Sequence, residues 1–263
     1  MRTSTTATVP EVRTRSLVTG SSRGIGAAIA HALAARGDAV AVHAGRDLDA
    51  GRAVLAGLPG EGHLLVSGDL ADPAAVAALV ADAVAGLGGV DVLVNNAAAH
   101  DPLVIEESDY EQWQASWHRV LSVNVVGTAN VSWQVVRHLL DRPEGPAGGR
   151  IVTVGSRGAF RGEPQAMAYG ASKAAVHSLT QSLALALGGH GIGVSAVAPG
   201  FVATDMATSL LAGPVGDGIR AQSPFGRVGE PPEVAAAVAF LTGPDALWCS
   251  GAVLDVNGAS YLR

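Results

Sequence analysis

The sequence contains little cysteine and no cluster of metal-binding residues. Cys249 is the only cysteine among 263 residues, which excludes a disulfide within the chain. A lone thiol is typical of a reducing compartment, and we expect Cys249 to act as a small packing residue. The eight histidines are scattered, and neither a cysteine pair nor an H-E-x-x-H pattern occurs. We therefore predict no metal site.

Long apolar runs, an excess of basic residues and an apolar leader are also missing. No run of about eighteen apolar residues occurs without charge or glycine, so we predict no membrane-spanning helix. With 17 basic and 23 acidic residues the net charge is −6, which argues against a nucleic-acid surface. Residues 1–15 lack the apolar stretch of a secretory signal and are expected to form a disordered tail. Together these absences predict a cytoplasmic protein.

What the sequence does contain is an alternation of short apolar stretches with helical ones. Helices are predicted over residues 27–36, 74–85 and 169–187. Strands are predicted over residues 16–19, 40–43, 64–66, 91–94, 151–154, 194–197 and 253–256. This order predicts an α/β fold, a Rossmann-type three-layer sandwich whose doubly wound parallel sheet has about seven strands. Since no linker divides residues 16–263, we expect a single domain.

A glycine-rich segment follows the first predicted strand and precedes the first predicted helix. Gly20, Gly24 and Gly26 form the pattern G-x-x-x-G-x-G. A strand, a glycine turn and a helix in this order present backbone N–H groups and a helix N-terminus to an anionic phosphate. In a chain with 34 glycines such a pattern also arises by chance. The strand before it and the helix after it favour the phosphate site.

Tyr169 and Lys173 form the second informative pattern. They lie four residues apart, so they share one face of a helix. A phenol has a pKa near 10 and is a poor acid–base catalyst at neutral pH, but a nearby cation lowers that pKa. We therefore predict that Lys173 lowers the pKa of Tyr169 and that the pair handles a proton. An ordinary helix surface would carry the same spacing.

Ser156 lies upstream outside a G-x-S-x-G elbow, so a hydrolase is not favoured.

In their order these motifs resemble the short-chain dehydrogenase/reductase family, over a match from about Ser16 to the end of the chain. The chain looks most like the 3-oxoacyl-carrier-protein reductases and the glucose dehydrogenase-type members. The resemblance implies the catalytic residues Asn124, Ser156, Tyr169 and Lys173. It implies cofactor contacts from Gly20, Ser22, Arg23, Gly24, Ile25, Gly26, Arg46, Asp69, Leu70, Asn96, Ala97, Tyr169, Lys173, Pro199, Gly200, Val202 and Thr204. Substrate contacts are expected from Ser156, Gly158, Phe160, Met167 and Phe201.

The resemblance also implies roles for these residues. Tyr169 would exchange a proton with the substrate oxygen, and Ser156 would hold that oxygen. Lys173 would bind the nicotinamide ribose, and Asn124 would hold a water for proton resupply. Residues 204–226 resemble the mobile substrate lid of the family, and their glycines are consistent with closure.

The end of the second predicted strand bears on the choice of cofactor. NAD sites place an acid there to bind the ribose 2′-OH, but this chain has Ala44 near that position. Arg23 and Arg46 could instead clamp a 2′-phosphate. Asp47 is the alternative acid if the strand runs longer. We favour NADP(H) over NAD(H).

We predict an NADP(H)-dependent oxidoreductase that transfers hydride between nicotinamide and a carbonyl or secondary alcohol. The alternatives are a 3-oxoacyl-thioester reductase of fatty-acid or polyketide type and an NAD(H)-dependent sugar or alcohol dehydrogenase. A cofactor-binding regulatory protein is the third alternative. A carrier protein is not favoured as a partner, because residues 143–149 and 188–191 lack Lys and Arg. We expect a small-molecule substrate and a homotetramer or homodimer.

Overall fold

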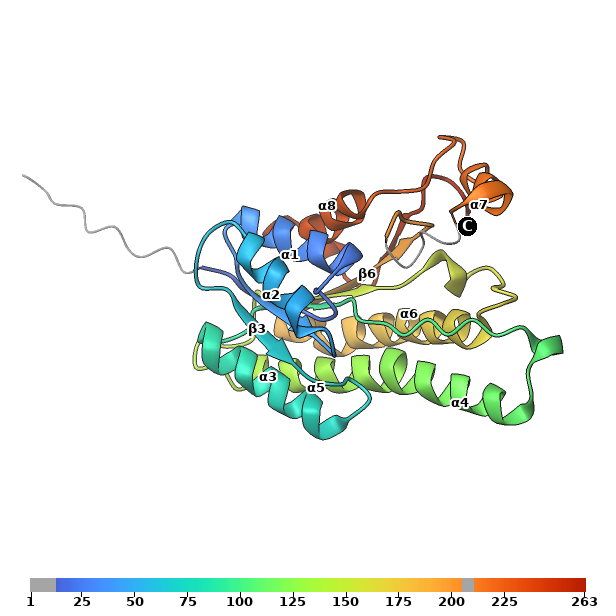
Figure 1. The fold of residues 1–263 in the computed structure, drawn as a ribbon. Coiled ribbons are helices and arrows are strands. Elements are labelled where there is room, and N and C mark those ends of the chain that lie inside the picture. The colour runs from blue at the N-terminus through green and yellow to red at the C-terminus, as the bar shows by residue number, and fades with distance from the viewer. Residues whose placement is uncertain (1–12, 205–210) are drawn as a thin grey trace, which may run out of the picture.

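The computed structural model describes residues 13–204 and 211–263 (Figure 1). Its seven parallel strands form one sheet in the order β3-β2-β1-β4-β5-β6-β7. The strands are β1 (Arg15–Val18), β2 (Ala39–Ala44), β3 (Leu64–Ser67), β4 (Val92–Asn95), β5 (Arg150–Val154), β6 (Gly193–Pro199) and β7 (Val253–Val256). Each predicted strand is present, and the doubly wound fold is confirmed.

Helices connect the strands. The α-helices are α1 (Gly24–Arg36), α2 (Leu48–Gly57), α3 (Pro73–Leu87), α4 (Tyr110–Leu121), α5 (Thr128–Leu140), α6 (Met167–Leu187), α7 (Gly213–Arg220) and α8 (Pro231–Leu241). A π-helical turn, η2 (Ser122–Gly127), joins α4 to α5. Short 3₁₀ segments are η1 (Ile105–Glu107), η3 (Arg157–Ala159), η4 (Gly188–His190) and η5 (Pro244–Cys249).

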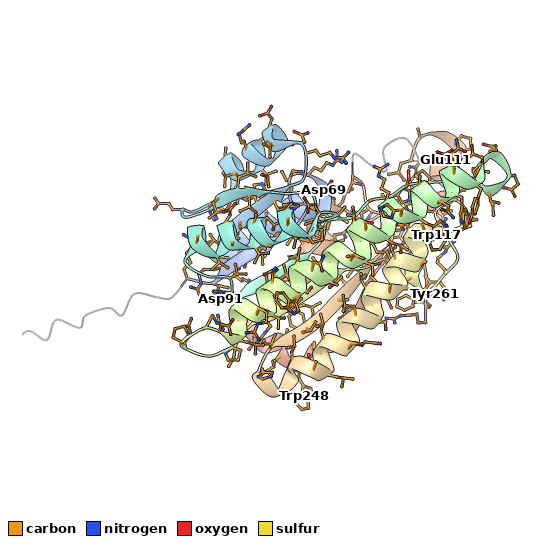
Figure 2. The ribbon with its side chains drawn as sticks, turned by 90° about the horizontal axis from the view of Figure 1, so that it is seen from below. Asp69, Asp91, Glu111, Trp117, Trp248 and Tyr261 are labelled. Carbon is orange, nitrogen blue, oxygen red and sulfur yellow. The ribbon has the colours of Figure 1, made fainter. Side chains whose placement is uncertain are left out.

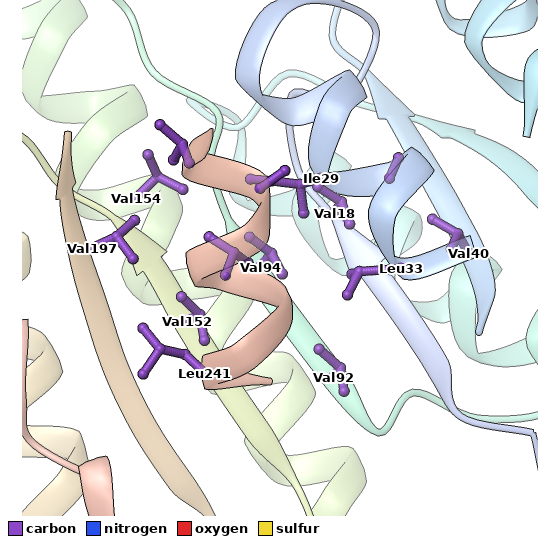
Figure 3. Packing of buried hydrophobic residues seen from close by; sticks show 14 of the residues in the cluster. Val18, Ile29, Leu33, Val40, Val92, Val94, Val152, Val154, Val197 and Leu241 are labelled. Carbon is purple, nitrogen blue, oxygen red and sulfur yellow. The ribbon is translucent and has the colours of Figure 1, made fainter. Parts of the chain in front are cut away.

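Alternating side chains of the strands build two cores, one on each face of the sheet. Val18 and Val94 point to the face covered by α1 and α8, whereas Leu17 and Leu93 point to the face covered by α3, α5 and α6. All four are buried. This period of two follows from strand geometry. Figure 1 shows the two helical layers on either side of the sheet, and Figure 3 shows the first core.

The strand order places β1 next to β4, although β2 follows β1 in the chain. This reversal is the switch point at which open α/β sheets bind ligands beyond the carboxyl ends of their strands. Gly20 and Ser156 follow β1 and β5 at this edge, and Asn95 ends β4 there. Asp91 lies at the opposite edge, where its carboxylate binds Arg15 and Arg142 (Figure 2).

Two of the predicted segments fall partly outside the described residues. Residues 1–12 of the predicted tail and residues 205–210 of the predicted lid lie there. The rest of the lid segment contains α7. Across residues 13–204 and 211–263, no helix combines the length and apolar character that crossing a membrane requires.

Candidate active site

The glycine turn packs against its own chain so closely that two of its positions exclude a side chain. Gly20 has a φ of 64°, and a Cβ there would lie 2.7 Å from the Ala97 Cα. A Cβ on Gly26 would lie 2.3 Å from the Gly20 carbonyl oxygen and 2.4 Å from the Asn96 amide nitrogen. The turn therefore leads directly into α1 and leaves the N-terminus of this helix open to a phosphate.

Hydrogen bonds from Thr19 and Asn96 join this turn to the segment after β4. The Thr19 Oγ1 accepts hydrogen bonds from the backbone N–H groups of Asn96 (3.0 Å) and Ala97 (3.1 Å). The Asn96 Nδ2 donates to the carbonyl oxygens of Thr19 and Gly20, each at 3.0 Å. The predicted cofactor residues Gly20, Asn96 and Ala97 are thus brought together.

His43 holds the other side of the same turn, and the sequence interpretation did not identify it. Its Nδ1 accepts from the Gly20 N–H (2.9 Å), and its Nε2 lies 2.9 Å from the Gly68 carbonyl oxygen. These partners require a neutral ring with its proton on Nε2. Burial lowers the pKa of His43, which favours the same neutral form. A buried histidine at a strand end was the available signal.

The segment after β2 carries the residues predicted to select the cofactor. Arg46 is exposed and pairs loosely with Asp69 at 3.8 Å. Arg23 is also exposed and precedes α1. Asp47 caps α2 by accepting from the Ala50 N–H at 3.0 Å, so its carboxylate is already used. The structure thus places two exposed arginines after β1 and β2, and the first acid after β2 serves as a helix cap.

Ser156 and Lys173 converge on the end of β5. The Ser156 Oγ accepts from the Gly158 N–H at 3.0 Å and hydrogen-bonds the Tyr169 side chain. The Lys173 Nζ donates to the Val154 carbonyl oxygen at 2.8 Å. Lys173 is 4% exposed, and burial lowers its pKa to about 8. Loss of water around the ammonium, without a carboxylate beside it, causes this shift.

Tyr169 differs from the sequence-based expectation in one respect. Burial raises its pKa to about 12, and the nearby Glu163 carboxylate also raises it, while the Ser156 hydrogen bond lowers it. The predicted lowering by Lys173 is therefore wrong for the protein without ligands. The Lys173 Nζ lies 5.4 Å from the centre of the phenol ring, and it is directed to Val154. The Tyr169 phenol stays protonated at neutral pH.

Asn124 lies in the π-helical turn η2, where its side chain is buried and fully engaged. The Oδ1 accepts from the Ala99 N–H (2.7 Å), and the Nδ2 donates to the Ala99 carbonyl (3.0 Å) and to the Ser172 Oγ (2.9 Å). Asn124 thus fastens the segment after β4 to α6, next to Lys173. Its water-holding role stays a prediction. Such π turns are frequent at functional sites.

The other residues that were predicted to contact the cofactor lie on neighbouring segments. Pro199 ends β6, Val202 is buried, and a Cβ on Gly24 would lie 3.3 Å from the Thr204 Cγ2. Leu70 is buried beside Gly127 of η2. The remaining predicted cofactor residues, Ser22, Ile25 and Gly200, lie in the glycine turn, at the start of α1 and just after β6.

The predicted substrate residues lie on both sides of η3. Gly158 belongs to η3, Phe160 ends it, and Met167 begins α6. His100 packs edge-on against Tyr169, with ring centres 5.0 Å apart. Phe201 lies under the Arg157 guanidinium, at 4.9 Å from its ring centre. Arg157 is buried and was missed, because its position after Ser156 carried no signal in the sequence.

Comparisons with known proteins show which sequences and structures this chain is similar to. A family model described as enoyl-(acyl carrier protein) reductase matches residues 20–259. A 3-oxoacyl-[acyl-carrier-protein] reductase of Escherichia coli (strain K12) is 37% identical over 249 residues, which cover 94% of this chain and 96% of that protein.

Two solved structures are also similar. A short-chain dehydrogenase from Burkholderia cenocepacia J2315, in complex with NADP, has a TM-score of 0.83 and 38% identity, covering 94% of this chain and 97% of that chain. A 3-ketoacyl-(acyl-carrier-protein) reductase from Brucella melitensis, complexed with NADH, has a TM-score of 0.85 and 31% identity. The match covers 96% of this chain and 99% of that chain.

The buried Lys173 predicts a specific pH dependence of stability. Because its pKa falls from 10.5 to about 8 on folding, the unfolded chain binds more protons between these values. The free energy of unfolding of the ligand-free protein should therefore rise relative to Lys173→Met from about pH 8 to 10.5, by roughly 1–3 kcal/mol. Denaturant unfolding of both proteins across this range measures the difference. A constant difference would contradict the burial of an unpaired ammonium.

Proposed function

The chain belongs to the short-chain dehydrogenase/reductase family, and from that premise we propose that it is an NADP(H)-dependent reductase of carbonyl compounds. Members of this family are oxidoreductases that act on CH–OH groups with NAD(P). The observation that carries the proposal is the convergence of Ser156, Tyr169 and Lys173 at the end of β5, beside the glycine turn. The bound nicotinamide supplies the hydride, and the protein supplies the proton.

The residues around the glycine turn fit a dinucleotide. The glycine turn leads directly into α1, and the N-terminus of this helix suits a pyrophosphate. Arg46 and Arg23 would hold a ribose 2′-phosphate, because Asp47 is occupied as a helix cap. The neighbour from Burkholderia cenocepacia binds NADP, whereas the one from Brucella melitensis binds NADH. The arginines of this chain favour the phosphorylated cofactor.

The proton is placed on Tyr169 for carbonyl reduction. Burial and Glu163 keep the phenol protonated, so it can donate to the oxygen that becomes an alkoxide. The Ser156 hydroxyl, which already bonds Tyr169, would hold the same oxygen. Lys173 would interact with the nicotinamide ribose, and its charge would favour the phenolate that forms after transfer. In alcohol oxidation these steps reverse.

The substrate is a small carbonyl compound or its alcohol. A 3-oxoacyl thioester is the second candidate, supported by the 37% identity to the reductase of Escherichia coli. Against a carrier protein, the loop Arg142 to Gly149 offers one arginine, and that side chain is buried on Asp91. A ketone without a carrier therefore suits this surface better. A regulatory protein without turnover would not need Ser156, Tyr169 and Lys173 together at the end of β5.

We also propose that the protein is a cytoplasmic homo-oligomer, as a homotetramer or homodimer. Trp248 of η5 is 99% exposed, and Leu185 of α6 is 88% exposed. The two segments are adjacent, because a Cβ on Gly251 would lie 3.8 Å from the Ala184 Cβ. Figure 2 shows Trp248 at the end of this helix. Exposed apolar side chains that gather in this way are typical of an interface.

Replacing Tyr169 by phenylalanine should remove most of the activity. We expect Tyr169→Phe to lower kcat by roughly 10²–10⁴-fold, because the proton donor is lost while packing is kept. The measurement is NADPH oxidation with a panel of ketones, sugars and acyl thioesters. Tyr110→Phe, at an exposed tyrosine of α4, is the control and should retain full turnover. Near-normal turnover of Tyr169→Phe would refute the assignment.

The cofactor preference should depend on Arg46. In Arg46→Ala, kcat/KM for NADPH should fall about tenfold or more, since charge-assisted hydrogen bonds to the 2′-phosphate are lost. The value for NADH should change little. Arg52→Ala is the matched control, because Arg52 is an exposed arginine of α2 that pairs with Asp49. A wild-type preference for NADH would overturn the proposed cofactor.

Oligomer formation should depend on Trp248. Sedimentation of the wild-type protein should give the mass of a dimer or of a tetramer of the 26.3 kDa chain. In Trp248→Ser we expect a shift toward smaller species, because a large exposed apolar side chain is removed from the interface. Ser182→Ala, at an exposed position of α6, serves as the control. A wild-type monomer would disprove this part of the proposal.

A further inference from the structure

A cavity lies beside the candidate site, between β7, α8 and the segment around α7. Arg157, Phe201, Ser223, Asn257 and Ser260 are among the residues that line it. None of Ser156, Tyr169 and Lys173 lines it. Arg157 directly follows Ser156, the cap residue of η3, so this wall of the cavity is continuous in the backbone with the catalytic candidate. A group held there would belong to a part of the substrate away from the reacting carbonyl.

Arg157 is the most buried charged group of this cavity, at 3% exposure. Its guanidinium donates to two neutral oxygens, the Ser260 Oγ at 2.5 Å and the Gln222 Oε1 at 2.6 Å. It also stacks on the Phe201 ring at 4.9 Å. Within the described residues no carboxylate forms an ion pair with Arg157. Buried charges are ordinarily paired, because removing them from water is unfavourable.

The other charges that line the cavity are paired with one another or with neighbours. Arg227 binds Glu233 at 2.6 Å, and Asp255 binds Arg263 at 3.0 Å. Among the lining residues that the structure describes, Arg157 therefore carries the one uncompensated charge.

A second cation adds to the positive charge here. Arg161 donates to the same Gln222 Oε1 at 3.3 Å. Two guanidinium groups thus share one neutral acceptor. Burial and the proximity of Arg161 both lower the pKa of Arg157, whereas the Glu163 carboxylate raises it. Because the net shift is downward, the charged form of Arg157 is destabilised in the ligand-free protein. An anion bound here would stabilise the charged form of Arg157.

We propose that Arg157 binds a carboxylate of the substrate, so that the enzyme reduces oxo acids whose carboxylate lies several bonds from the carbonyl. This inference rests on the proposed reductase function and names its substrate class. The planar guanidinium suits a carboxylate. The hydroxyl groups of Ser223 and Ser260 at the cavity wall donate to the carbonyl oxygens of Gly258 and Asn257, so Arg157 would be the main partner of the anion.

Glu163 supports one orientation of such a substrate. Its carboxylate lies on the Tyr169 side of η3, where a Cβ on Gly158 would approach its Oε1 to 2.9 Å. It raises the pKa of Tyr169, as expected of a negative charge near the phenol. A substrate carboxylate placed on that side would be repelled. Glu163 also lies near enough to Arg157 to raise its pKa, so a substrate carboxylate would reach the guanidinium from the cavity, whose lining does not include Glu163.

The test compares acids with neutral amides of the same shape. The probes are methyl ketones that end in a carboxylate, with two to about six methylene groups between the two functions, and the corresponding primary amides. With NADPH, the wild-type kcat/KM for the best acid should exceed that of its amide about tenfold or more, as expected for a hydrogen bond to a charged group. Reduction of amides and acids at equal rates would overturn the inference while leaving the proposed function intact. If neither series is reduced and no other ketone is reduced either, the proposed function itself is refuted.

Two variants locate the effect at Arg157. Arg157→Gln should lower kcat/KM for the acid by about ten- to a hundredfold and change the amide less than about threefold. Gln222→Glu keeps the shape of the side chain but places a carboxylate on the guanidinium, and it should abolish the preference for acids in the same way. It provides the decisive result if Arg157→Gln does not fold.

Arg161→Gln is the matched control, because it removes a neighbouring guanidinium that bonds the same Gln222 and does not line the cavity. It should keep most of the preference for acids. An equal loss in Arg161→Gln and Arg157→Gln would indicate a diffuse attraction between charges and would overturn the inference. A preference that persists in Gln222→Glu would also overturn it.

Discussion

Gly26 carries no side chain because the Gly20 carbonyl oxygen and the Asn96 amide occupy the place where a Cβ would stand. This contact brings α1 close to the end of β1 and opens its N-terminus. Thr19 and Asn96 then connect the turn to β4, across the point where the strand order reverses. The positions of the cofactor residues follow from this contact, and so does the place of the catalytic groups beside them.

Burial at the same edge determines the chemistry of the catalytic groups. The first turns of α6 bring Tyr169 and Lys173 against the end of β5, where little water remains. Burial shifts the pKa of a phenol and the pKa of an ammonium in opposite directions, because it favours the neutral form of each group. Tyr169 therefore holds its proton, and Lys173 holds its own less firmly. In the proposed reaction Tyr169 would donate this proton to a carbonyl oxygen, and the charge of a bound cofactor would act on both groups.

The substrate side of the site has the opposite electrostatic character on its two flanks. Glu163 lies beside Tyr169, and Arg157 is buried next to Ser156 without a paired carboxylate. A fold that stores an unpaired buried cation loses stability unless a ligand compensates it. Binding of an anion and orientation of the carbonyl would then come from one arrangement. Arg157 lines the cavity, whereas Glu163 lies outside its lining, beside Gly158.

The sequence by itself determined the sheet, the glycine turn and the order of the candidate catalytic residues. These features depend on local patterns: alternating apolar residues, Gly20 and Gly26 between a strand and a helix, and the four-residue spacing of Tyr169 and Lys173. Only the tertiary structure decided how His43 supports the turn, how Asp47 is used as a cap, and where the Arg157 charge lies. It also reversed the expected pKa shift of Tyr169. Burial, hydrogen-bond direction and unpaired charge depend on segments far apart in the chain, and no spacing within the sequence records them.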